Sequence, residues 1–300
     1  MPGNINYQRG VALVVVLWAC TLLAILLGGY ATLTRTEALQ ARYQAARVRL
    51  HYLAEAGVMR GMAEFAGKNG GGWIADGRPY VLRLDEADIE IRNHDDAGKV
   101  DLNTATPEVL QGLFQVAGLD ATSAQALAAN VQESRDAGGK VFRDEGTQRY
   151  ARAGLARGPR YTEFATPEDV QGVLGMTPTL YRRIAPFITV WSRRPTPAPA
   201  FASALILATL PGVSIESAQR FVAIRQASPP QNLPKALPNG TVIGSWRGGN
   251  VRTIVATAKG ADGVRVSIHA TVRLEYVRGH ASVGVLRWDE GDTENGGSLQ

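Results

Sequence analysis

The sequence has a single cysteine, Cys20, and this residue lies inside the most apolar run of the chain. One cysteine excludes an intrachain disulfide, and it also excludes a zinc site built from several thiolates. Cys20 is most simply interpreted as one small apolar side chain among others. The fold must therefore form without cross-links that depend on cysteine.

Histidine is also scarce, and recognised catalytic motifs are missing. The chain has no glycine-rich phosphate loop, no nucleophile elbow and no metalloprotease helix motif. The histidines are far apart and show no metal-ligand spacing: His51, His94, His269 and His280. Because no acid, base or nucleophile cluster stands out, the sequence predicts a protein that is not an enzyme.

Excess charge is small, with a net charge of +5 over 300 residues. This charge permits contact with anionic lipid or nucleic acid but requires neither. The length leaves room for a membrane helix together with one or two globular units.

A long apolar run follows a short polar N-terminus. Residues 1–10 carry one charge, Arg9, whereas residues 11–29 carry none. At 1.5 Å per residue, a helix over 11–29 is about 28 Å long, close to the hydrocarbon thickness of a bilayer. A cleaved secretory signal ending near Ala31 and a plain single-span anchor are alternative interpretations of this run. Arg residues on both sides of it leave the orientation open.

The helix is expected to continue far beyond the membrane. No proline occurs between Pro2 and Pro79, and glycines at 67 and 70–72 end the pattern. One helix over residues 11–66 is about 80 Å long. Apolar or small residues with helical spacing mark one face of its second half: Leu39, Tyr43, Ala46, Leu50, Leu53 and Gly57.

Period-two alternation predicts strands at both ends of the remaining chain. Residues 67–102 contain short strand patterns at 80–84, 89–92 and 98–102, and residues 251–288 read as an antiparallel meander. Neither group is large enough to be stable alone. We therefore expect them to form one sheet packed on the long helix, with a linker at 228–250 and a disordered acidic tail at 289–300.

Residues 103–227 predict an all-α insert between these strands. Thr106 is suited to cap a helix that starts with Pro107. Three helix–glycine–helix units recur, broken near Gly118, Gly175 and Gly212. The third unit resembles a DNA-binding helix-hairpin-helix, but the second glycine of that motif is replaced by Ser214. A membrane-anchored DNA-binding protein of a competence-type system is therefore the alternative function.

The polar leader ending in Arg9-Gly10, followed directly by Val11-Ala12-Leu13, resembles the N-terminus of type IV prepilin-like proteins. In that family a prepilin peptidase cuts after the glycine, so the resemblance implies cleavage between Gly10 and Val11. It also implies a methylated mature N-terminus. Major pilins and pseudopilins carry Glu at the fifth mature position, whereas this chain has Val15.

The absence of that Glu is typical of the K-type minor pseudopilins of type II secretion systems. Further landmarks of this branch are Val100-Asp101-Leu102-Asn103-Thr104-Ala105, Phe164-Ala165-Thr166-Pro167-Glu168 and Pro186-Phe187-Ile188-Thr189-Val190. The resemblance implies an α+β fold, in which a pilin-type helix packs on an antiparallel sheet and a helical-hairpin domain interrupts the strands.

The resemblance also implies a role. The protein would be a single-pass protein of the Gram-negative inner membrane with its head in the periplasm. It would lie at the tip of the pseudopilus and assist pseudopilus assembly and the export of folded proteins across the outer membrane. Its partners would be the I-type and J-type minor pseudopilins, the major pseudopilin, the prepilin peptidase and the inner-membrane assembly platform. No nucleic acid is expected.

Calcium is a weaker expectation, because some family members carry a carboxylate-rich segment suited to a hard cation. The matching region here is 131–136, where Arg135 intrudes and one acid is missing. Solvated acids on a long loop between Gly138 and Tyr161 are the competing interpretation. The candidate ligands are Glu133, Asp136, Asp144, Glu145 and Glu163.

Overall fold

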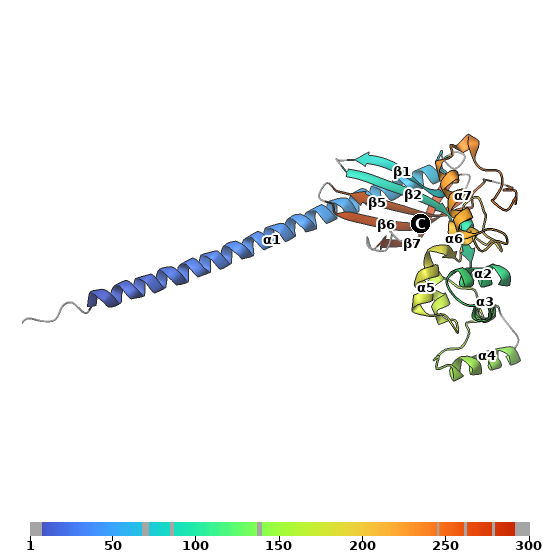
Figure 1. The fold of residues 1–300 in the computed structure, drawn as a ribbon, viewed down its shortest axis with the longest axis horizontal. Coiled ribbons are helices and arrows are strands. Elements are labelled where there is room, and N and C mark those ends of the chain that lie inside the picture. Colours follow the sequence, from blue (N-terminus) through green and yellow to red (C-terminus); the bar gives the residue numbers. More distant parts are fainter. Residues whose placement is uncertain are drawn as a thin grey trace, which may run out of the picture.

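The structure is a computed structural model that describes residues 8–67, 72–84, 87–136, 140–244, 246–260, 263–277 and 280–291. A long helix forms a stem, and its last turns are built into a head at one end (Figure 1). The head contains a sheet and a group of short helices beside it. The predicted α+β class, with a pilin-type helix on an antiparallel sheet, is confirmed.

The stem is α1 (Gln8–Ala66), a single helix of 59 residues. It contains no proline, and glycine-rich sequence follows its last residue. Residues 8–10 of the expected leader already belong to this helix, while residues 1–7 lie outside the described part of the chain. The helix is therefore continuous from the leader into the head.

The head is organised around a five-stranded antiparallel sheet in the order β1-β2-β5-β6-β7. Strand β2 precedes the insert in sequence and β5 follows it, yet they pair directly, with Ile91 opposite Ala256. The insert therefore leaves and re-enters the sheet between adjacent strands. The strands are β1 (Asp76–Leu84), β2 (Ala87–Asp95), β5 (Val251–Lys259), β6 (Arg265–Val277) and β7 (His280–Gly291).

The last turns of α1 cover one face of this sheet. Two glycines on the buried side of the helix allow this close approach: a Cβ at Gly57 would lie 2.7 Å from Ile89 Cγ2, and one at Gly61 would lie 2.8 Å from Ile254 Cγ2. Apolar side chains fill the space around them, because burying each stabilises the fold by about 1.5–3 kcal/mol. The buried helix residues are Leu50, Leu53, Ala54, Val58 and Phe65.

The insert begins with a helical hairpin made of α2 (Pro107–Val116) and α3 (Ala121–Arg135). The Thr106 hydroxyl accepts a hydrogen bond from the Val109 amide, as the predicted cap requires. Gly118 has a φ of 105° in the turn, a conformation that glycine adopts readily. Both helices bury their apolar side chains in a second core, separate from the one under α1.

The other two units are less helical than predicted. In the second unit a 3₁₀ turn (Pro167–Gly172) replaces the first helix and leads to α5 (Pro178–Ile184). In the third unit a single turn, α6 (Ala204–Leu207), precedes α7 (Ile215–Ala227). Residues 228–250, expected to be a linker, contribute buried Leu237 and Ile243 to the core of the insert.

Three local predictions are wrong. The third early strand does not join the sheet, because β3 (Val100–Asp101) pairs in parallel with β4 (Ile188–Thr189), so the insert is not all-α. The expected loop after 138 contains the helix α4 (Lys140–Arg152). The predicted disorder from 289 fails at its start, because β7 continues to Gly291, and residues 292–300 lie outside the described residues.

Candidate functional site

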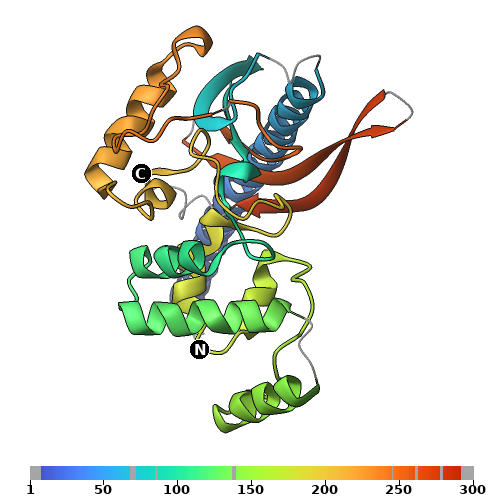
Figure 2. The same ribbon diagram turned by 90° about the vertical axis from the view of Figure 1, so that its right-hand side faces the viewer.

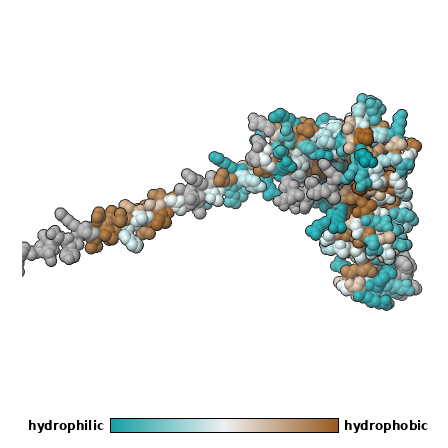
Figure 3. All heavy atoms as spheres, in the orientation of Figure 1, coloured by the Kyte–Doolittle hydropathy of each residue, from teal (hydrophilic) through white to brown (hydrophobic). Residues whose placement is uncertain are grey.

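The N-terminal half of α1 is an exposed apolar rod. Residues Val11–Tyr30 have a mean hydropathy of 2.8, and none of these residues is buried within the chain. Figure 3 shows this segment as a continuous apolar section of the stem, well away from the head. Its length and composition fit a membrane span, and an exposed surface of this kind requires lipid or a partner to cover it.

The residues of the predicted cleavage site lie at the start of this rod. Gly10 and Val11 are both within α1. Val15 is exposed, and no Asp or Glu occurs before Glu37. The structure thus presents an apolar helix with no carboxylate at the fifth position after Gly10. The cleavage itself stays a prediction.

The predicted apolar face of the stem is divided between the head and solvent. Leu50 and Leu53, in its second half, are buried against the sheet. Leu39 and Tyr43, in its first half, are 66% and 55% exposed. Because the same face continues through both parts, the exposed half is suited to pack against helices of neighbouring molecules.

The insert is fixed to the head by buried polar contacts. The carboxylate of Asp96 accepts hydrogen bonds of 2.7 Å from the hydroxyls of Thr189, in the insert, and Thr253, in β5. Lys99 Nζ lies 2.8 Å from the same carboxylate. At the far edge of the sheet, Arg287 in β7 pairs with Glu168 in the insert. These contacts fix the direction in which the insert projects.

Sequence reasoning missed this network, because its members look like ordinary turn and strand residues. Asp76 and Arg225 belong to a similar buried group between β1 and α7. The only sequence signal is their charge next to apolar neighbours. That signal does not identify a partner at long sequence separation.

The five candidate calcium ligands do not converge. Glu133 is buried and pairs with Arg149 of α4, while Glu163 pairs with Arg193, whose hydrogen bond lowers the pKa of that carboxyl. The other three acids are exposed: Asp136, Asp144 and Glu145. Within the described residues, no group of three or more His, Cys, Asp or Glu side chains is placed to hold a metal ion.

The glycine turns of the hairpins are used for internal packing. Arg183 Nη1 donates to the carbonyl of Ala117, next to the Gly118 turn. In the third hairpin, the Asn239 side chain donates to the Pro211 carbonyl beside Gly212. Both contacts bind a carbonyl of the turn to another part of the insert, so these two turns serve internal packing. The DNA-binding alternative is therefore not favoured.

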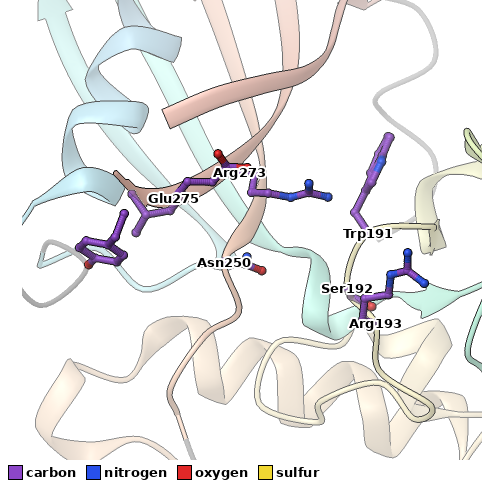
Figure 4. Close-up of a pocket in the computed structure, with 8 residues that line it drawn as sticks. Trp191, Ser192, Arg193, Asn250, Arg273 and Glu275 are labelled. Atoms are coloured by element: carbon purple, nitrogen blue, oxygen red, sulfur yellow. The ribbon is translucent and has the colours of Figure 1, made fainter. Parts of the chain in front are cut away.

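One hollow of about 680 Å³ lies between the insert and the sheet. Trp191, Ser192 and Arg193 of the insert line one side, and Arg273 and Glu275 of β6 line the other (Figure 4). The lining combines aromatic rings with charges of both signs. It holds no arrangement of acid, base and nucleophile suited to catalysis.

Comparison with known proteins agrees with this architecture. Residues 88–193 match the family model of the type II secretion system (T2SS), protein K. The fold resembles a chain in the crystal structure of the GspK-GspI-GspJ complex from the enterotoxigenic Escherichia coli type 2 secretion system. The TM-score is 0.54 at 14% identity, covering 85% of this chain and 100% of that chain. No curated protein matches the chain.

The family match covers the part of the chain where strand β2 leads into the insert. The fold match covers 85% of the chain. Both agree with a sheet that is interrupted by an insert. Residues 88–193 therefore resemble protein K of the type II secretion system in sequence, and the chain resembles the matched chain of the GspK-GspI-GspJ complex in fold.

Proposed function

We propose that this protein is the tip subunit of a type II secretion pseudopilus. The main support for this proposal is that α1 is unbroken and continues from an exposed apolar span into the head. Such a helix is stable in lipid before assembly and against neighbouring helices afterwards, because both surroundings cover its apolar surface. The role is structural, and no catalytic activity is part of the proposal.

The position at the tip is supported by two further features. The insert lies at the end of the stem remote from the apolar span and projects sideways (Figure 1). A subunit stacked above would have to avoid this bulk. Val15 leaves the stem without the carboxylate that would need a partner from a subunit above, since an unpaired carboxylate in hydrocarbon is costly.

The remaining parts of the proposal concern the path to the tip. A prepilin peptidase cuts between Gly10 and Val11, and the new N-terminus is methylated. The protein waits in the inner membrane as a single-pass protein with its head in the periplasm. It then joins the I-type and J-type minor pseudopilins, and the assembly platform adds the major pseudopilin beneath them. This complex assists the export of folded proteins across the outer membrane.

The first test is the intact mass of the membrane-extracted protein, produced with and without a prepilin peptidase. A peptidase-dependent loss of residues 1–10, abolished by Gly10→Leu, is the expected result. Gly28→Leu is the matched control, since it changes a glycine of the same helix with no neighbouring atom within 4 Å. Cleavage near Ala31, or no cleavage at all, would contradict the proposal.

A further inference from the structure

The two edges of the sheet differ in how they are protected. Natural edge strands avoid unwanted pairing by means of proline, charge, bulges or cover. Strand β1, at one edge, contains Pro79 at a register shift and exposed Arg83. Strand β7, at the other edge, has no Lys, Arg, Asp, Glu or Pro in residues 280–286. The first half of β7 therefore lacks the usual protection.

The second half of β7 is protected in several ways. Its ladder with β6 shifts register between Thr271 and Val272, which leaves Leu286 as a bulge. Beyond the bulge, Arg287 pairs with Glu168 of the insert. Glu290 lies 3.2 Å from His51 Nδ1 of α1. Protection of the edge thus begins directly after residues 280–285.

The bare segment, residues 280–285, projects from the head. Figure 2 shows the end of the β6–β7 hairpin extending away from the stem and the insert. Ala281, Ser282 and Gly284 are exposed, and Val285 is 53% exposed. Every second residue of an edge strand directs its backbone N–H and C=O away from the sheet. Within the described residues no strand pairs with this side of β7.

We propose that residues 280–285 pair, by main-chain hydrogen bonds, with a strand from a neighbouring minor pseudopilin. The inference rests on the proposed function, which places such subunits beside this one. The strands of the sheet run roughly along α1 (Figure 1). A neighbour whose stem packs alongside α1 therefore brings its own strands close to the direction of β7, as strand addition requires.

The hollow beside the hairpin adds side-chain recognition to this edge. It is lined by residues 273–276 of β6, which pair with residues 281–284 of the bare segment. Trp191 and Arg273 face this space from opposite sides (Figure 4), and Tyr276 is 73% exposed. Trp, Tyr and Arg are the residue types that most often dominate the energy of protein interfaces. A side chain of the neighbour's strand, paired with residues 280–285, fits into this hollow.

The test is hydrogen exchange of the full-length protein in detergent, alone and with the I-type and J-type pseudopilins of the same system. The expected result is slower exchange of the amides in 281–285 only when the other pseudopilins are present. The amides of β1, at the opposite edge, serve as the internal control. Unchanged exchange at 281–285 in a complex that does form overturns the inference and leaves the proposed function intact.

The matched variants are Ser282→Lys with Val285→Lys on the bare edge, and Val81→Lys with Leu84→Lys at exposed positions of β1. Lysine on an edge opposes strand pairing. We expect the first pair to weaken complex formation about tenfold or more and the second to leave it unchanged, with equal melting temperatures showing that both fold.

Equal binding by both pairs overturns the inference. A third result also overturns the inference: slow exchange of 281–285 in the isolated protein, together with sedimentation as a dimer. In that case a second copy of this chain occupies the edge. Failure of the unmodified chain to bind either pseudopilin contradicts the proposed function instead.

Discussion

The carboxylate of Asp76 in β1 lies 3.5 Å from Nε of Arg225 in α7, and both side chains are buried. Arg225 Nη1 also donates to the carbonyl of Ala202, at 2.8 Å. Arg78 binds the same carboxylate through Nε and Nη2, at 3.0 and 2.9 Å. Burial lowers the pKa of Arg225 to about 10, so the guanidinium is still charged at neutral pH. This group joins the insert to the edge of the sheet.

Replacing Arg225 by Ala is therefore expected to destabilise the protein. Arg78 still binds the Asp76 carboxylate in this variant, but the carbonyls of Ala202 and Pro199 lose their donor. Each buried polar group left unsatisfied typically costs about 1–3 kcal/mol. The measurement is denaturant unfolding of the purified protein in detergent. Arg220→Ala, on the exposed side of the same helix, is the control and should change stability by less than about 0.5 kcal/mol. Equal effects of the two changes would show that the buried group contributes little.

The packing of α1 on the sheet predicts an unusual effect of glycine replacement. In a helix Gly→Ala normally stabilises by about 1 kcal/mol. At Gly57, however, the new Cβ would lie 2.9 Å from the Ala256 Cβ, and overpacking costs about 1–3 kcal/mol. We therefore expect Gly57→Ala to lower the melting temperature of the head. Gly28→Ala, which meets no atom within 4 Å, should leave it unchanged. An increase at Gly57 would contradict the close approach.

His94 predicts a pH dependence of stability. Burial, with Lys99 and Arg92 nearby, lowers the pKa of His94 from its usual 6.5 to about 4. Between these values the unfolded chain binds a proton that the folded chain does not, so stability is lost as pH falls from about 6.5 to about 4. Asp76 and Asp96 also act on this imidazole and favour its charged form.

The comparison that isolates His94 is the melting temperature of the unmodified protein and of His94→Asn between pH 7 and 4. The unmodified protein should lose more stability on acidification than the variant. His280→Asn, at an exposed position, should follow the unmodified protein. Parallel curves for the unmodified protein and His94→Asn would rule out the effect.

Sequence patterns were sufficient for elements that depend on local residues. The end of α1 follows from glycines, the start of α2 from Thr106 and Pro107, and β5 from the approximate alternation over 251–259. Each of these signals acts within a few residues. The fold class followed from them together with the family resemblance.

Features that depend on distant partners were not predictable. Helix α4 has little apolar periodicity, and Tyr150, a fully buried side chain in it, hydrogen-bonds with Ser134 of α3. The last residues of β7 read as an acidic tail, but Glu290 finds its partners on α1. Asp76 and Arg225 are 149 positions apart. No short-range pattern links residues at that separation.

Calcium is expected to leave the stability unchanged. Glu133 is the one buried acid among the candidates, and Arg149 already neutralises it. The other candidates are exposed or paired elsewhere, so a hard cation would find too few oxygen ligands in one place. The measurement is the melting temperature in millimolar calcium against the same concentration of magnesium. A specific increase with calcium, abolished by Glu133→Gln, would contradict this expectation.

Val15 offers a test of the tip position within a working secretion system. Val15→Glu places a carboxylate in the apolar span, which costs about 2.5–3.5 kcal/mol at the middle of a membrane helix and less near its end. A subunit with a neighbour above finds a partner for this group on that neighbour, whereas a tip subunit has no neighbour above. We therefore expect secretion to fall several-fold in Val15→Glu and to stay normal in Val15→Leu. Co-purification with the I-type and J-type subunits should fall in parallel. Normal secretion with Val15→Glu would mean that a partner for the carboxylate exists, and hence that another subunit lies above this one.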